Sequence, residues 1–227
     1  MTTLTTRRFP SRAALDAALS ERLGQALAAA FPSAVMLSGG TTPLPAYRSL
    51  AQRPPPHDAG LHIVFTDERY VPSDSEASNY HQARALLNAL ALPDAAIARV
   101  RTELPLPDAA ADYERQLTTL VNSGVRIGLG LLGLGADGHT ASLFSASDLE
   151  RARGRLAIAV QRPDGMSAVS VTPDFLARVG EPLFVVAGSG KENAVRALLA
   201  QDLHLPAWRA VQGCPRAELW LAEAESA

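Results

Sequence analysis

The stretch from 126 to 145 reads RIGLGLLGLGADGHTASLFS and decides the fold. Its first half is short and apolar, which is typical of a strand buried in a parallel sheet, and we predict that strand over 127–134. A glycine-bearing turn, 135–138, follows and delivers His139, and residues 140–142 favour the start of a helix. A loop that leaves the carboxyl end of a parallel strand opens where α/β sheets bind ligands. The stretch therefore predicts a parallel α/β sheet with a candidate active site at His139.

Strands and helices alternate along the rest of the chain. Further strands are predicted over 34–37, 61–66, 97–101, 156–160, 168–171, 183–187 and 218–221. Helices are predicted over 11–31 with Ser11 as N-cap, over 43–50, over 79–90 with Ser78 or Asn79 as cap, over 108–121, and from 192 to 199. This alternation predicts a doubly wound, mostly parallel sheet with helices on both faces. We expect a single domain over 1–227, with room for a small lobe formed around 150–180.

The composition argues for an ordinary globular enzyme or binding domain. The 227 residues are 47% hydrophobic and 19% charged, and the net charge is −2. With that net charge, the sequence shows no excess of positive charge for binding nucleic acid or a membrane surface. No apolar run approaches the roughly 20 residues that span a bilayer. A single cysteine, Cys214, fits a reducing compartment, and the N-terminal residues lack the apolar core of a signal peptide. We expect a soluble, cytoplasmic protein.

Four predicted strands end in polar or glycine-bearing loops. These loops cover 38–43, 67–69, 135–139 and 188–191. Because the carboxyl ends of parallel strands meet at one edge of a sheet, the four loops are expected to form one ligand-binding edge.

Two of these loops suggest an anionic ligand. The first has successive backbone N–H groups ahead of a helix, in the order Ser38, Gly39, Gly40, Thr41, Thr42. That arrangement suits a phosphate, although a tight turn explains it equally well. Lys191 stands at the start of the next predicted helix, where its charge opposes the helix dipole. An anion would explain its position, and a solvated lysine is the alternative.

Two stretches resemble nucleotide-binding motifs, but their surroundings argue against a nucleotide site. Gly133, Gly135 and Gly138 have the spacing of a dinucleotide fingerprint, but His139 would crowd the pyrophosphate, and the next strand ends without the acid that binds a ribose. Gly190-Lys191 resembles a P-loop, but the first glycine and the Ser or Thr after the lysine are absent. We expect no nucleotide cofactor and no metal, since the histidines show no cluster spacing.

The individual polar residues leave alternatives open. His139 is either a catalytic base or a structural hydrogen-bonder at the sheet edge. Asp137, two residues earlier, either orients the imidazole or caps the turn. Asp67 and Arg69, taken singly, fit a surface ion pair as well as a site.

Taken together, four motifs resemble the 6-phosphogluconolactonase family. They are SGGTTP at 38–43, FTDERYVP at 65–72, SNY at 78–80 and LGLGADGHTASLF at 132–144. The resemblance extends over nearly the whole chain and implies a Rossmann-like fold in the superfamily that includes glucosamine-6-phosphate deaminases. It also implies hydrolysis of 6-phospho-D-glucono-1,5-lactone to 6-phospho-D-gluconate, the second step of the oxidative pentose phosphate pathway, without a cofactor. We expect a monomer or weak homodimer, although the sequence alone does not determine the oligomeric state.

The resemblance also assigns expected roles. His139 would be the base, Asp67 would orient Arg69 or the imidazole, and Asp137 would assist. The residues expected to bind the substrate and its phosphate are Ser38, Gly39, Gly40, Thr41, Thr42, Arg69, Gly138 and Lys191. Ser142 could act as a nucleophile in principle, but no G-x-S-x-G elbow surrounds it.

The chain departs from the family pattern at two positions. Ala168 stands where the lactonases carry an arginine, and Glu223 aligns only loosely with an aspartate near the C-terminal tryptophan. Arg162, at the end of the preceding predicted strand, is our candidate for the missing cation, against the alternative of a solvated loop arginine. Two other functions stay open: a deaminase or isomerase acting on an amino sugar phosphate, and a non-catalytic sugar-phosphate sensor.

Overall fold

The computed structural model describes residues 2–30 and 32–223. Its main element is a sheet of six strands, every neighbouring pair of which is parallel. In their order across the sheet these are β1 (Thr3–Phe9), β9 (Arg216–Ala222), β8 (Val179–Val186), β5 (Arg126–Leu132), β2 (Ser33–Leu37) and β3 (Leu61–Phe65). The predicted fold class is confirmed: a doubly wound parallel sheet with helices on both faces.

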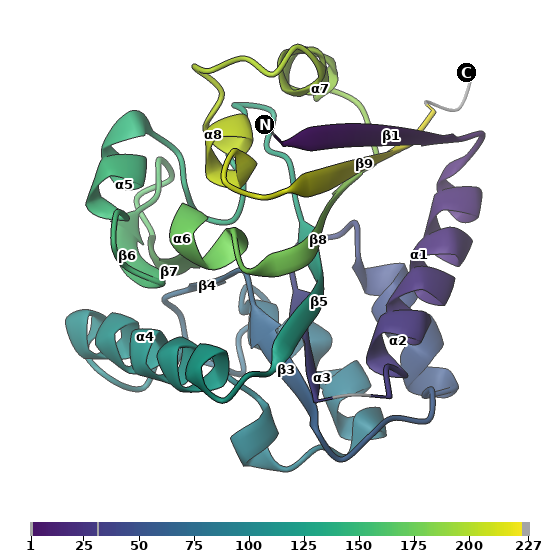
Figure 1. The fold of residues 1–227 in the computed structure, drawn as a ribbon, viewed down its shortest axis with the longest axis vertical. Coiled ribbons are helices and arrows are strands. Elements are labelled where there is room, and N and C mark those ends of the chain that lie inside the picture. Colours follow the sequence, from purple (N-terminus) through teal and green to yellow (C-terminus); the bar gives the residue numbers. More distant parts are fainter. Residues whose placement is uncertain (1, 31, 224–227) are drawn as a thin grey trace.

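Helices cover both faces of this sheet (Figure 1). One face packs against α1 (Arg12–Leu27), α2 (Leu44–Gln52) and α3 (Asn79–Leu90). The other packs against α4 (Leu106–Asn122), α5 (Ala146–Arg151), α6 (Pro173–Leu176), α7 (Glu192–Leu199) and α8 (Pro206–Val211). Strand β8 shows the division, because Leu183 and Val185 lie in the first core while Phe184 and Val186 lie in the second. Such two-sided burial is what makes these strands continuously apolar.

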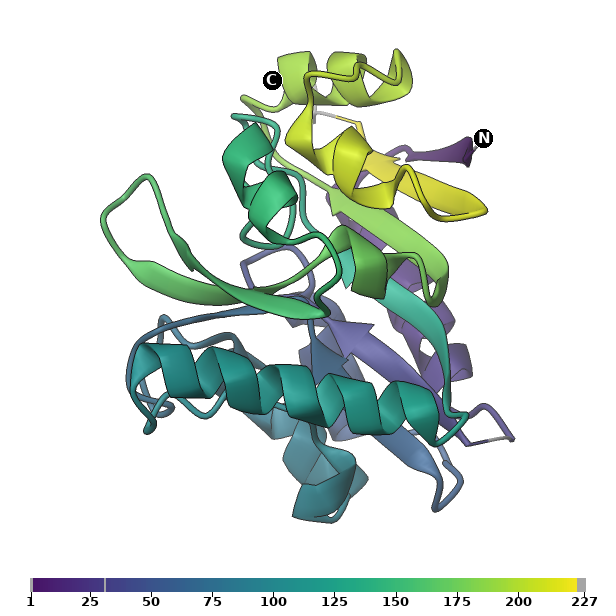
Figure 2. The ribbon, with the colours of Figure 1, turned by 60° about the vertical axis from the view of Figure 1, so that its left-hand side comes forward.

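A second, smaller sheet lies beside the main one. It is antiparallel and consists of β4 (Asp67–Arg69), β7 (Ser167–Val171) and β6 (Ala157–Gln161), in that order. Figure 2 shows the β6–β7 hairpin, in green, above α4. Residues 67–69 were predicted as a loop and are instead the first strand of this sheet. The chain leaves β3, passes through Thr66 and pairs at once with β7.

Several predicted boundaries are corrected by the structure. The N-caps Ser11 and Ser78 are confirmed, since their hydroxyls accept from the N–H groups of Ala14 and His81. Helix α1 ends at Leu27, and Phe31, the predicted end, lies outside the described residues. The predicted strand over 97–101 is wrong, because that segment contributes only an isolated bridge between Ile97 and Ile63, and a 3-10 turn, η1 (Asp94–Ala96), precedes it. Strand β1 and helices α6 and α8 were not predicted.

The segment after His139 also differs from expectation. Residues 140–142 do not start a helix; Thr140 and Leu143 form an isolated bridge, and Ala141 has a left-handed backbone with φ 49°. Helix α5 begins only at Ala146, where Ser145 and Asp148 form a reciprocal capping box. In the described part of the chain, no helix has the length and apolar character needed to cross a membrane.

Candidate active site

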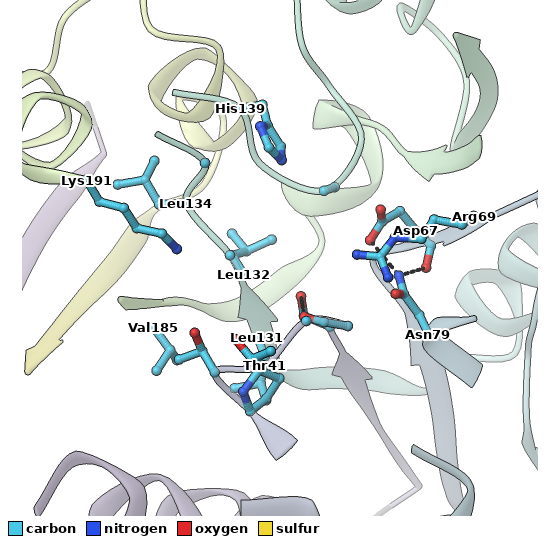
Figure 3. A pocket seen from close by; sticks show the side chains of 18 of the residues that line it. Thr41, Asp67, Arg69, Asn79, Leu131, Leu132, Leu134, His139, Val185 and Lys191 are labelled. Carbon is cyan, nitrogen blue, oxygen red and sulfur yellow. Dashed lines mark hydrogen bonds between the residues drawn. The ribbon is translucent and has the colours of Figure 1, made fainter. Parts of the chain in front are cut away.

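A cavity of about 300 Å³ opens at the carboxyl ends of β2, β5 and β8, beside β4 of the smaller sheet. Its polar lining comes from the 38–42 loop, β4, α3, the turn after β5, the end of β6 and the loop before α7, while Leu131, Leu132 and Val185 form an apolar part of the wall. Figure 3 shows Lys191 and Arg69 on opposite sides of this space, with His139 between them on one wall and Thr41 on the facing wall. The predicted edge therefore does gather its loops around one cavity.

The turn that follows β5 presents His139. The Gly135 N–H donates to the carbonyl of His139 at 2.9 Å, and the Gly138 N–H donates to the carbonyl of Gly135 at 3.0 Å. Gly138 has φ 84°, a backbone that favours glycine, and a Cβ there would overlap Leu205 Cδ1. The resulting tight loop turns the imidazole into the cavity (Figure 3).

Asp137 holds the His139 ring. Its Oδ1 lies 2.5 Å from His139 Nδ1 and also accepts from the His139 backbone N–H at 3.2 Å. Partial burial raises the pKa of the Asp137 carboxyl, but the hydrogen bonds from His139 together outweigh it, so the pKa lies below the ordinary value of an aspartate. An ionised Asp137 accepts a proton from Nδ1, so the tautomer of the neutral ring that fits this contact has its lone pair on Nε2. The ring also packs 4.4 Å from the Phe144 ring, centroid to centroid.

Asp67 lies in a buried polar network rather than in an ion pair. Its side chain accepts from Thr66 Oγ1 at 2.7 Å, Ser142 Oγ at 2.6 Å and Asn79 Nδ2 at 3.2 Å. Within residues 2–30 and 32–223, neither Arg69 nor His139 forms a hydrogen bond or ion pair with it. The alternative of a surface ion pair between Asp67 and Arg69 is therefore wrong: Asp67 is buried, and Arg69 Nη1 instead donates to the Ala77 carbonyl at 2.9 Å.

Three cationic side chains line the cavity. Arg69 comes from β4, Lys191 is the N-cap residue of α7, and Arg162 follows β6. Lys191 is half-buried, and that burial lowers the pKa of its ammonium group from the ordinary value. Arg162 is only 14% exposed, because Asp164 holds the guanidinium at 3.0 Å and Phe144 packs 5.3 Å from it. Arg162 Nη1 also lies 3.5 Å from Ser142 Oγ.

The 38–42 loop carries amide groups that face no partner. The Ser38 N–H donates to Tyr47 Oη at 3.1 Å and the Gly40 N–H to Gln82 Oε1 at 2.9 Å, so these two are already engaged. Among the described residues, the N–H groups of Gly39, Thr41 and Thr42 have no hydrogen-bond partner. Arg12 donates to the carbonyls of Thr41 and Thr42 at 3.3 and 3.1 Å, which fixes the loop from outside.

The structure brings together most of the predicted site residues and adds others. Asp137 and Gly138 do not line the cavity: the first supports His139, and the second is a buried residue of the same turn. Asn79 was missed as a site residue, although its motif was recognised, because a buried amide at the start of a helix gives no distinctive local signal. The described residues contain no group of three His, Cys, Asp or Glu side chains placed to hold a metal ion.

Comparison with known proteins decides the family. The profile described as glucosamine-6-phosphate isomerases/6-phosphogluconolactonase matches residues 10–220. The chain belongs to this family. A 6-phosphogluconolactonase of Synechocystis sp. is 35% identical over 221 residues, which cover 92% of this chain and 89% of the relative. One of Nostoc sp. is 38% identical over 200 residues, covering 84% and 81% of the two chains.

Solved structures agree with this family assignment. A crystal structure of 6-phosphogluconolactonase from Thermotoga maritima has a TM-score of 0.78 and 28% identity, and covers 98% of this chain and 100% of its own. A monomeric glucosamine-6-phosphate deaminase has a TM-score of 0.80 at 15% identity, covering 96% and 97% of the two chains. At that identity the likeness to the deaminase concerns the fold alone. The resemblance inferred from the four sequence motifs is therefore confirmed.

Proposed function

We propose that this protein hydrolyses 6-phospho-D-glucono-1,5-lactone to 6-phospho-D-gluconate, as a carboxylic ester hydrolase of the oxidative pentose phosphate pathway. The observation that carries the proposal is the pairing of Asp137 with His139 at a cavity that also holds Arg69, Arg162 and Lys191. A base and several cations in one small cavity fit a substrate that is both an ester and a phosphate. The family's relatives carry the same activity in their names.

In this proposal His139 is the general base. Its Nε2 lone pair takes a proton from water while the water oxygen attacks the lactone carbonyl carbon, giving a tetrahedral oxyanion and an imidazolium. Asp137 stabilises that imidazolium through Nδ1–H. The oxyanion then collapses, the bond from the carbonyl carbon to the ring oxygen breaks, and the imidazolium returns its proton to that oxygen. The product is a hydroxy acid and the ring of His139 is neutral again.

The phosphate is assigned to the cations and to the 38–42 loop. Lys191 and Arg69 supply charge, and the free N–H groups of Gly39, Thr41 and Thr42 supply donors. All these groups come from one chain, so we propose that one protomer suffices and that the protein acts as a monomer or weak homodimer, over 1–227 as one unit. Because its substrate is a phosphorylated sugar derivative, we place its action in the cytoplasm.

A coupled assay tests the proposal directly. Production of 6-phosphogluconate from freshly formed lactone is followed through a 6-phosphogluconate dehydrogenase, with and without a chelator. Lactone turnover that resists the chelator is expected. Ammonia release from glucosamine 6-phosphate would point to a deaminase instead, and tight binding of sugar phosphates without any turnover would point to a sensor.

The proposal predicts that Lys191 and Arg69 bind the phosphate of the substrate. Lys191→Ala and Arg69→Ala should each weaken 6-phosphogluconate binding by about tenfold or more, since a charge-assisted hydrogen bond is worth about 1.5–3 kcal/mol. They should affect the unphosphorylated gluconolactone far less, because their partner is absent from it. Calorimetric titration and KM for both lactones measure this. Arg196→Ala is the control, because it removes an exposed cation from α7, the helix that Lys191 caps. Equal losses for both lactones would refute the assignment.

Arg162 is predicted to supply the cation that Ala168 lacks. In the smaller sheet Arg69 pairs with Ala168, and Ala168 pairs with Val160. Arg162 lies two residues beyond Val160, just past the end of β6, where the alternation of the strand places it on the same face. It lines the same cavity as the 38–42 loop. Arg162→Ala should therefore raise KM for the phosphorylated lactone by about tenfold.

The rescue experiment sharpens this prediction. Ala168 is fully buried, so an arginine there needs space that the intact site does not offer. Adding Ala168→Arg to Arg162→Ala should partly restore KM, whereas Ala168→Arg alone should not improve it. Arg153→Ala, an arginine outside this cavity, serves as the control. An unchanged KM in Arg162→Ala would leave Arg162 without a role in binding.

A further inference from the structure

Asn79 makes more contacts with the site than its place in the sequence suggests. It is the first residue of α3, is 2% exposed and lines the cavity. Its backbone N–H donates to Glu68 Oε1 at 2.6 Å, and its Nδ2 donates to the Asp67 carbonyl at 2.8 Å and to Asp67 Oδ1 at 3.2 Å (Figure 3). Strand β4 thus holds both the backbone and the side chain of Asn79.

The direction of the Asn79 amide is fixed by chemistry. Both groups that Nδ2 meets on Asp67 are acceptors, a carbonyl and a carboxylate oxygen. A flipped amide would place its own oxygen against them, so Nδ2 must face Asp67 and Oδ1 must face the opposite way. Oδ1 is buried and has no hydrogen-bond partner among the described residues. An orphaned buried acceptor is rare in folded proteins and calls for a reason.

This oxygen packs against the 38–42 loop without a hydrogen bond to it. Oδ1 of Asn79 rests against Gly39, at the position that a Cβ on that residue would occupy. One turn further along α3, Gln82 Oε1 accepts the Gly40 N–H at 2.9 Å. The first turn of α3 therefore contacts two successive residues of the loop, and on its other side it is bonded to Asp67.

We propose that Asn79 is a positioning residue that sets the 38–42 loop relative to Asp67. The amide is rigid and contacts both, so a displacement of either is passed to the other. Its catalytic consequence rests on the proposed lactonase function, in which that loop binds the phosphate. The close packing also explains why Gly39 has no room for a side chain.

Substitution at Asn79 tests the proposal against a matched control. Asn79→Ala should lower kcat/KM by about tenfold, less than the roughly 10²-fold that a full 1 Å misplacement can bring. Part of the loss should appear as weaker binding of 6-phosphogluconate, because the loop moves. Asn79→Asp, which sets a carboxylate against Asp67, should lose more than Asn79→Ala. Asn88→Ala, an exposed asparagine in the same helix, should leave activity and binding unchanged.

A double-mutant cycle with Gly39 tests the contact itself. Gly39→Ala puts a methyl group where the Asn79 amide lies, so it should impair activity alone. In Gly39→Ala/Asn79→Ala the methyl enters the vacated space, and the loss should be smaller than the product of the two single losses. Losses that multiply, or an Asn79→Ala variant with wild-type kcat/KM and 6-phosphogluconate affinity, would overturn the proposal. If Asn79→Ala does not fold, Asn79→Ser replaces it in both experiments.

A readout without turnover separates this inference from the proposed function. The backbone amide resonances of Gly39 and Gly40 in ¹⁵N spectra report the loop directly. They should shift in Asn79→Ala and stay in place in Asn88→Ala. An inactive wild-type protein whose glycine resonances respond in this way would refute the lactonase proposal and support the positioning role. Unchanged resonances in Asn79→Ala would refute the positioning role whatever the activity.

Discussion

His139→Ala should lower kcat by about 10²–10⁴-fold while the protein stays folded, which is the range that removal of a general base brings. The reason is geometric. The turn after β5 aims the ring into the cavity, and Asp137 engages Nδ1 at 2.5 Å, so the remaining nitrogen faces the substrate. No other described histidine lines the cavity, so none is placed to replace it.

The measurement is kcat in the coupled lactone assay, with thermal unfolding as the test of folding. His204→Ala is the control: it removes an exposed histidine that does not line the cavity, and it should behave as wild type. KM for the phosphorylated lactone should change little in His139→Ala, because the groups assigned to the phosphate remain. A kcat within a few-fold of wild type would remove His139 from the role of base.

The buried strands and amphipathic helices were predictable from sequence because the spacing of their apolar residues indicates which side chains are buried. Strand β5 and the leucines of α1 are examples: each places apolar side chains where only a core accepts them. Strand β1 shows the opposite case. It lies at the edge of the sheet, reads TLTTRRF, and buries only Phe9, so its sequence carries no strand periodicity. Its partner β9 supplies the pairing that the local sequence does not reveal.

The wrong prediction for 140–142 has a tertiary cause. Thr and Ser beside a glycine turn resemble a helix start, but here their hydroxyls have other partners. Thr140 Oγ1 donates to the Gly133 carbonyl at 2.8 Å, and Ser142 Oγ donates to Asp67 at 2.6 Å. Asp67 lies 75 residues earlier in the chain, so no local pattern could reveal that contact. The same contact excludes Ser142 as a free nucleophile in this structure, since its hydroxyl is buried and bonded.

The chemistry of the site was easier to predict than its support. The cavity was predicted from glycine turns that follow strands, from His139 and from Lys191 at the start of a helix. These features meet because parallel strands bring their carboxyl ends together. The smaller sheet was not predicted as a second sheet, because β4 has only the three residues Asp67–Arg69 and pairs antiparallel with a distant hairpin. That pairing is what turns Asp67 inward and brings Arg69 and Arg162 to one face. Asn79 supports the site through Asp67 of β4, so its role could not be predicted without that pairing.

Gly135→Ala should reduce kcat by roughly 10²-fold, the cost of displacing a catalytic group by about 1 Å. A methyl group on Gly135 would overlap both the His139 ring and the Asp137 carboxylate. Gly135 does not have a positive φ, so alanine is compatible with its backbone, and the conflict concerns the two side chains alone. The expected defect is therefore in catalysis rather than in folding.

The control for the Gly135 experiment is a glycine in β5, the strand that precedes the turn. Gly128→Ala places a methyl group on β5 where nothing lies within 4 Å, and it should leave kcat unchanged. Adding Gly135→Ala to His139→Ala should cause no further loss, because the ring that the methyl displaces is already absent. KM and the unfolding temperature should stay close to wild type in Gly135→Ala. Wild-type kcat in this variant would show that the pairing of Asp137 with His139 tolerates displacement, and a further loss in the double variant would show that Gly135 acts through something other than His139.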